Sequence, residues 1–194
     1  PKVNVSLHQG SPDQVARMVM DEVAEIGIAT ESLADYPDLV TLPCYEWQHV
    51  LVLPKDHPLA EKERVSLEDL AAEPIITYHP SFTGRTRIDH AFAAKKLTPR
   101  IALEAIDSDV IKTYVRLGLG VGIVAEMAVR DDTNADLAVR PMGHVFGQNI
   151  ARVAFKRSAY LRNFVFRFAE LLSDRLDRHL IAKALAGHSQ DYDL

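Results

Sequence analysis

The sequence has few of the residue types on which disulfide bonding, membrane insertion or catalysis depend. Its 194 residues include one cysteine, Cys44, and one tryptophan, Trp47. A single thiol cannot form an internal disulfide, so we expect a cytoplasmic protein in which Cys44 is a buried strand residue. No apolar run approaches the roughly 20 residues that cross a bilayer, and no signal peptide is visible, so no membrane partner is expected.

The chain also lacks the positive charge that nucleic-acid binding requires. Its formal net charge is −5, with 47% hydrophobic and 25% charged residues. An acidic chain does not neutralise phosphates as a whole, so we expect no direct DNA contact by this part of the protein. The balance of residues is that of a globular protein, and the length allows one large domain or two small lobes.

Motifs for catalysis, metals and cofactors are missing as well. There is no Gly-x-Ser-x-Gly, no Walker loop and no His-Glu-x-x-His, and the eight histidines show no i, i+4 pair. The glycine-rich stretch 118–122 lies between a predicted helix and a predicted strand, whereas a dinucleotide fingerprint must follow a strand and precede a helix. We interpret these glycines as a helix end, and we predict no catalytic residue, no metal site and no cofactor.

What the sequence does contain is a regular alternation of strand and helix patterns. Ser11, Pro12 and Gln14 form a capping box that predicts a helix start. Strands are predicted at 3–7, 26–29, 39–44, 47–53, 75–78, 100–106, 121–124, 137–139 and 150–155. Helices are predicted from Pro12 and at 66–70, 83–96, 108–117 and 160–185.

This order predicts an α/β fold with a parallel sheet component. The middle block makes a nearly complete α/β lobe, and the first strand–helix–strand unit needs further strands to form a useful sheet. We therefore predict two Rossmann-like lobes joined by two crossover strands. Lobe I would comprise residues 1–44 plus 149–194, and lobe II residues 45–148. A cleft between hinged lobes is a standard site for small molecules.

Hydroxyl-bearing residues at strand ends and helix starts are the candidate ligand contacts. Ser11 follows Gly10 at a helix start, and Thr30 ends a strand at the sheet edge where α/β folds bind ligands. Both residues have an alternative role as simple caps or turn residues.

The segment 81–86 offers a second helix start of this kind. Phe82 precedes Thr83, which supplies a hydroxyl, and Gly84 lets a ligand approach the backbone N–H groups. Thr83 also has the alternative role of a cap. Trp47 lies just after the predicted crossover, where its side chain packs the hinge or lines the cleft.

Several blocks resemble the effector-binding domain of LysR-type transcription regulators. They are Val52–Leu59, with its His-Pro-Leu, and the stretch from Asp109 to Ile123. The blocks Leu7–Pro12, Leu42–Tyr45, Phe82–Arg85 and Lys112–Gly118 resemble more narrowly the subgroup that activates cysteine biosynthesis genes. The resemblance runs from Pro1 to about Phe168.

The resemblance implies a type 2 periplasmic-binding-protein-like fold in a homodimeric or tetrameric regulator. It implies that promoter DNA is bound only through an N-terminal helix-turn-helix outside this sequence, and that the first strand and helix of lobe I also lie outside it. The implied effectors are N-acetylserine or O-acetylserine, with sulfate or thiosulfate at the same site. Thr30, Trp47 and Thr83 match positions that line the family's ligand cleft.

Three alternatives remain at this point. A close relative that controls sulfonate-use genes would share these blocks and sense adenosine phosphosulfate. A solute-binding protein of a transporter would share the two-lobe fold, and an α/β enzyme would share the element order. The last has no nucleophile–base arrangement to support it.

Overall fold

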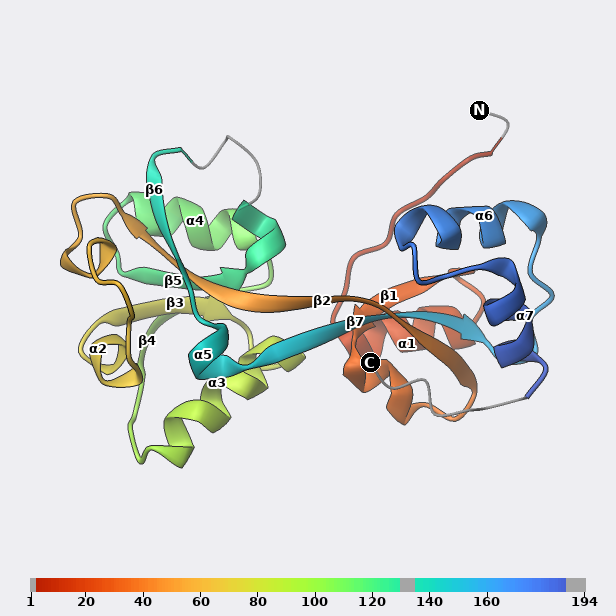
Figure 1. The fold of residues 1–194 in the computed structure, drawn as a ribbon, viewed down its shortest axis with the longest axis horizontal. Helices are drawn as coiled ribbons and strands as arrows, with labels where there is room; N and C mark the ends of the chain where they lie inside the picture. Colours follow the sequence, from red (N-terminus) through yellow and green to blue (C-terminus); the bar gives the residue numbers. More distant parts are fainter. Residues whose placement is uncertain (1–2, 130–134, 188–194) are drawn as a thin grey trace. The chain divides into compact units, whose positions relative to one another are not determined.

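Two long strands each run from one compact unit of the fold into the other. The computed structural model describes residues 3–129 and 135–187. Unit 1 comprises residues 1–46 and 150–194, and unit 2 residues 47–149. Strands β2 (Leu39–Pro54) and β7 (Gln148–Lys156) cross the boundary between them (Figure 1). The interpretation of these units as regulatory lobes I and II stays a prediction.

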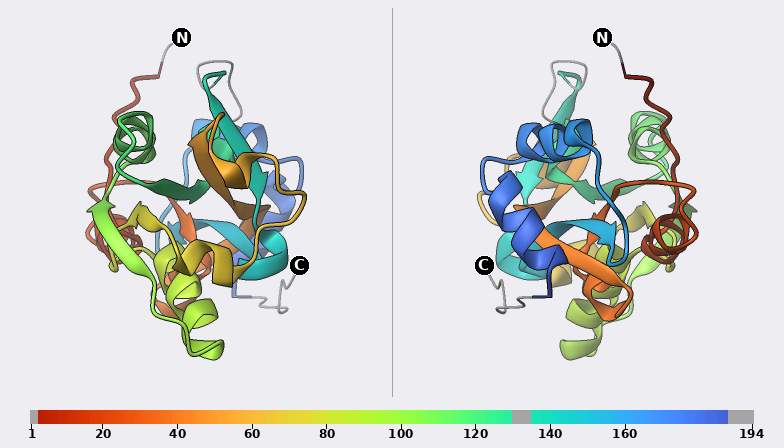
Figure 2. Two further views of the ribbon diagram at one scale, coloured as in Figure 1. Left: turned by 90° about the vertical axis from the view of Figure 1, so that its left-hand side faces the viewer. Right: turned by 90° about the vertical axis from the view of Figure 1, so that its right-hand side faces the viewer.

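Unit 1 is a sheet layer with helices on both faces. β1 (Gly27–Thr30) pairs antiparallel with β7, and β7 lies beside β2. Successive side chains of β7 point to opposite faces of the sheet. Val153 and Phe155 pack against α6 (Asn163–Leu172) and α7 (Arg178–Leu185) on one face. Ala154 packs against α1 (Pro12–Met20) on the other face. The right-hand view of Figure 2 shows α6 and α7 on one side of these strands and α1 on the other.

Unit 2 contains a five-stranded mixed sheet in the order β4-β3-β5-β2-β6. Its other strands are β3 (Pro74–Tyr78), β4 (Arg100–Ala105), β5 (Val121–Ala125) and β6 (Leu137–Pro141). β3 is parallel to β4 and β5, whereas β2 is antiparallel to β5 and β6. This arrangement gives the predicted parallel component.

Helices cover both faces of the unit 2 sheet. The core on one face includes Leu51 and Ile123 and the helices α2 (Leu67–Ala71), α3 (Thr83–Ala94) and α5 (Gly143–Phe146). The core on the other face is closed by α4 (Ser108–Arg116). The described residues also contain three short 3₁₀ helices: η1 (Glu31–Asp35), η2 (Pro58–Ala60) and η3 (Glu126–Val129). β5 is buried at Val121–Val124, as a strand covered on both faces must be.

Several local predictions are confirmed. The Ser11 capping box is present, with Ser11 N–H donating to Gln14 Oε1 over 2.9 Å. The helix predicted at 108–117 is α4, which Asp107 caps by accepting from Asp109 N–H over 2.7 Å, and Gly118 follows it with φ +75°. These signals depend on residues close in sequence, which is why the pattern alone predicts them.

Three element predictions are wrong. Residues 3–7 are not a strand in the described structure, because they have no pairing partner, and Val5 and Leu7 are exposed. The strands predicted at 39–44 and 47–53 are the single strand β2, which changes neighbours from β7 to β5 and β6 along its length. The tail is two helices, since Ser173 is extended and Asp177 caps α7 through a 2.7 Å bond from Leu180 N–H.

Residues 3–129 and 135–187 contain neither a membrane-spanning helix nor a cluster of metal-binding side chains. No helix there is both long and apolar enough to cross a bilayer. No group of three or more His, Cys, Asp or Glu side chains there is placed to hold a metal ion.

Candidate functional site

The start of α3 brings together most of the predicted ligand residues of unit 2. Phe82 occupies the N-cap position in an extended conformation, and its side chain makes no capping hydrogen bond. The turn before it is held by backbone bonds, in which Phe82 N–H donates to His79 O over 3.0 Å and Arg85 N–H to Phe82 O over 2.9 Å. Phe82 therefore supplies none of the side-chain acceptors that an N-cap residue normally gives to a helix start.

Trp47 lies against this first turn. Its side chain is 7% exposed, and a Cβ added at Gly84 would lie 3.3 Å from its Cη2 atom. Gly84 is itself buried. Trp47 therefore packs closely behind the Thr83–Gly84 segment, and only a glycine fits opposite it without displacing the indole.

Arg85 anchors the same first turn of the helix. Its buried guanidinium donates to Glu104 Oε1 over 2.6 Å, to Asp89 Oδ1 over 2.8 Å and to Tyr78 O over 3.0 Å. Burial acts to lower the pKa of Arg85, but the bonds to Asp89 and Glu104 outweigh it and the pKa is raised. All three of these partners belong to unit 2, so the guanidinium holds α3 against β3 and β4.

A second set of bonds fixes the strand ends beneath α3. The Tyr78 hydroxyl lies 2.7 Å from Ser108 Oγ and accepts from Ala125 N–H over 3.0 Å. Burial raises the pKa of this phenol, so Tyr78 is neutral at physiological pH. These bonds tie the carboxyl ends of β3 and β5 to the first turn of α4, and Phe82 stacks on Tyr78 with 5.9 Å between ring centroids.

The other two predicted residues lie in unit 1. Thr30 ends β1, is half-buried, and its Oγ1 lies 3.3 Å from Ser32 Oγ. Ser11 Oγ accepts from Gln14 N–H over 3.5 Å, so its capping role is real. The structure therefore groups Trp47, Phe82, Thr83 and Gly84 within unit 2 and places Ser11 and Thr30 within unit 1; whether any of them binds a ligand stays a prediction.

The sequence analysis missed two buried polar residues beside this group. His49 and Asn149 are both 0% exposed, and Asn149 Nδ2 lies 3.4 Å from His49 Nδ1. A signal for His49 was present, because it follows Trp47 by two residues on the same strand and so shares its face. Asn149 comes 100 residues later, and nothing local links the two.

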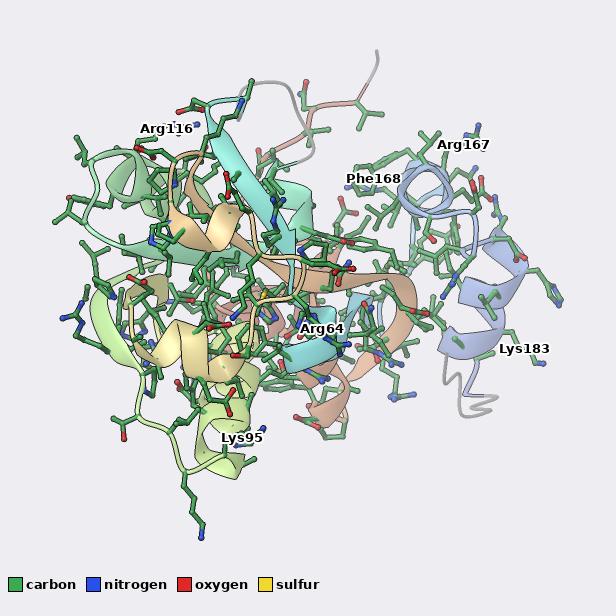
Figure 3. The ribbon with its side chains drawn as sticks, turned by 60° about the vertical axis from the view of Figure 1, so that its left-hand side comes forward. Arg64, Lys95, Arg116, Arg167, Phe168 and Lys183 are labelled. Atoms are coloured by element: carbon green, nitrogen blue, oxygen red, sulfur yellow. The ribbon has the colours of Figure 1, made fainter. Side chains whose placement is uncertain are left out.

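Two hollows lie away from these residues. An apolar groove of about 650 Å³ in unit 1 is lined by residues 3–8, by α1, β1 and the 23–26 loop, and by α6 residues that include Arg167 and Phe168. A smaller hollow of about 320 Å³ in unit 2 is lined by residues 64–68, Lys95, His144 and Val145. Figure 3 labels Arg167 and Phe168 at the first and Arg64 and Lys95 at the second. None of the six predicted ligand residues lines either hollow.

Comparisons with known proteins identify the family. The model of the LysR substrate binding domain matches residues 1–177. The chain is 54% identical over 194 residues to the HTH-type transcriptional regulator CysB of Burkholderia cenocepacia, covering all of this chain and 62% of the relative. It is 45% identical over 185 residues to the regulator SsuR of the same organism, covering 95% of this chain and 60% of that protein.

A solved structure agrees with this assignment. The cofactor-binding domain of the Cbl transcriptional regulator superposes with a TM-score of 0.85 at 42% identity, over 92% of this chain and 78% of that one. The predicted family and its type 2 periplasmic-binding-protein-like α/β fold are thereby confirmed. The relatives are transcriptional regulators by name, and the chain spans about 60% of the length of the CysB and SsuR proteins that it matches.

Proposed function

Because this chain belongs to the family of LysR substrate-binding domains, we propose that it is the effector-sensing part of a regulator of cysteine biosynthesis and sulfur assimilation genes. The likeness to CysB at 54% identity supports this function over the transporter and enzyme alternatives. The effector is a small anionic metabolite: N-acetylserine or O-acetylserine, with sulfate or thiosulfate at the same site.

The start of α3 is the observation that carries the proposal. A helix of 12 residues begins there without a side-chain cap, and Gly84 allows close approach to its backbone. The dipole of such a helix start favours an anion at this position. Thr83 adds a hydroxyl, and Trp47 with Phe82 gives the ligand an apolar contact. The same chemistry serves a carboxylate and a sulfate.

Thr30 and Ser11 are the proposed ligand residues of unit 1. Thr30 Oγ1 and Ser32 Oγ form a pair of neighbouring hydroxyls at the end of β1, which suits an oxyanion. The Ser11 hydroxyl already accepts from Gln14 N–H, so Ser11 would act as a donor to the ligand.

In the whole protein, effector binding would shift the conformation of a homodimer or tetramer. Promoter DNA would be bound by a separate helix-turn-helix, in keeping with the HTH designation of the relatives and with the acidic charge of −5 on this chain. A sensor of adenosine phosphosulfate for sulfonate-use genes is the alternative within the same family.

Thermal unfolding with N-acetylserine, O-acetylserine, sulfate, thiosulfate and adenosine phosphosulfate tests the proposal. A ligand at about 100 times its dissociation constant stabilises the fold by about 2.7 kcal/mol. The Thr83→Ala variant should weaken the binding of the stabilising ligand about tenfold or more in calorimetry, because it removes a hydrogen bond to a charged group.

The matched control is Thr113→Ala. The Thr113 hydroxyl is exposed on α4 and donates to Asp109 O over 2.7 Å, away from the start of α3. It should leave the dissociation constant unchanged. Equal binding by wild type and Thr83→Ala would remove Thr83 from the site, and stabilisation by none of the five compounds would contradict the proposed effector class.

A further inference from the structure

A buried imidazole supports the first turn of α3 from below. His49 is 0% exposed, and a Cβ added at Gly84 would lie 3.0 Å from its Nε2 atom. Its ring meets Trp47 edge to face, with centroids 5.0 Å apart, and Phe146 with centroids 5.6 Å apart. The helix start that carries the proposed anion site therefore rests on the His49 and Trp47 rings.

Packing alone does not explain a histidine at this position. The same face of β2 carries Leu51 and Leu53, which are buried in an apolar core with Phe146. An apolar ring would fill the space at lower cost, since a buried imidazole loses hydration that its neighbours must replace. A polar atom at the nearest contact to Gly84 indicates a role beyond filling space.

Asn149 supplies the polar partner. It is 0% exposed, and its Nδ2 atom lies 3.4 Å from His49 Nδ1. The backbone at His49 is held as well, because its carbonyl accepts from Met142 N–H over 3.0 Å at the start of α5. The pair thus holds the imidazole plane in one orientation, with Nε2 towards Gly84.

We propose that His49, oriented by Asn149, is a positioning residue of the effector site, which sets the direction of the first-turn N–H groups of α3 through Gly84 and Trp47. This rests on the proposed function. An anion held by backbone N–H groups is sensitive to sub-ångström shifts of those groups, because such hydrogen bonds weaken steeply with angle. A changed ring at position 49 moves them, whereas most of α3 stays anchored by Arg85 and the apolar core.

The test compares His49→Phe, His49→Gln and Asn149→Leu with the wild type. We expect His49→Phe and Asn149→Leu to keep a cooperative unfolding transition but to bind sulfate and N-acetylserine at least tenfold more weakly. His49→Gln keeps a polar group facing Asn149 and should restore the affinity to within about threefold. Emission from Trp47, the only tryptophan, should shift on binding in the wild type and in His49→Gln, and less in the other two variants.

The matched control is Thr77→Val, which removes another buried hydrogen bond of unit 2. Thr77 is 0% exposed and its hydroxyl donates to Ile123 O over 3.1 Å. It should lower the stability while leaving both dissociation constants unchanged. Wild-type affinity in His49→Phe and Asn149→Leu overturns the positioning role alone. Loss of affinity in His49→Gln and Thr77→Val to the same degree also overturns it. Failure of the wild type to bind any anion overturns the proposed function and this role together.

Discussion

The two units differ in how completely their sheets are covered and paired. In unit 2, five strands lie in one sheet, and helices close both faces. In unit 1, β1 has β7 as its only strand neighbour among the described residues, and the segment 3–8 runs beside an apolar groove without joining the sheet. Most exposed large apolar side chains of unit 1 line this groove: Val3, Val5, Leu7, Val23, Ile28, Phe164, Phe168 and Leu171.

The comparison shows that a segment with alternating apolar and polar residues forms a strand only where a neighbouring strand can pair with it. Val3, Val5 and Leu7 alternate with polar residues more regularly than Ile101, Leu103 and Ala105 do in β4, where Ala102 interrupts the pattern. The second set becomes a strand because β3 lies parallel to it and supplies the backbone partners. The first set has apolar side chains but no neighbouring strand in the described structure, so its N–H and C=O groups remain outside the sheet.

The largest expected effect contrasts two phenylalanines. Phe92 is 1% exposed in the core of unit 2, whereas Phe168 is 42% exposed at the groove of unit 1. Phe92→Ala should lower the free energy of unfolding by about 3–5 kcal/mol, because it leaves a cavity in a closed core. Phe168→Ala should cost less than about 1 kcal/mol in the same urea titration. Equal losses would mean that the groove is as well packed as the core.

An intermediate effect is expected for the binding of an apolar dye. The groove should bind anilinonaphthalene sulfonate in the native protein, and Phe168→Asp with Leu171→Glu should reduce its fluorescence severalfold. The stability should change by only about 0.5 kcal/mol per substitution, since both side chains are partly or largely exposed. The matched pair in unit 2 is Ile106→Asp with Leu117→Glu, each 67% exposed and outside the groove. That pair should leave the fluorescence intact; if it quenches the dye instead, the dye site is in unit 2.

The smallest effect concerns pH. Burial raises the pKa of Cys44 in unit 1 from 9.0 to about 11, partly opposed by the backbone of Val153 and the charge of Arg152. The folded state therefore holds this proton more tightly than the unfolded state does. Its stabilising contribution is complete below about pH 9 and is lost as the pH rises towards 11. The stability of the wild type should fall more steeply over this range than that of Cys44→Ala, and parallel curves would argue against a buried, protonated thiol.

Local chemistry decided which parts of the fold the sequence could predict. The capping residues Ser11, Ser66 and Asp107 act within three residues, and each helix begins within one residue of its predicted start. Asp177 gave a signal of the same kind and would have divided the tail into two helices, had it been read as a cap. The continuity of β2 depends on neighbours from distant parts of the chain, so no local pattern could predict it.

The same division holds for the candidate site. Thr83 and Gly84 could be proposed from the sequence because a helix start with a glycine is a local pattern. The packing of Trp47 on Gly84, and of His49 with Asn149, joins residues 37 to 100 positions apart and appears only in three dimensions. The identity of the effector rests on the likeness to CysB, because an anion site of this kind accepts several oxyanions.

The pairing of β1 with β7 also affects the order in which parts of the chain can fold during synthesis. Gly27 is partnered by Ala154, so the strand at the beginning of unit 1 has to wait for residues made much later. At about 5–20 residues per second, that delay is roughly 6–25 seconds on the ribosome. Unit 2 is continuous in sequence and can assemble during this interval. A nascent chain would therefore carry a folded unit 2 between two unfinished halves of unit 1, and chaperones would meet the protein in that form.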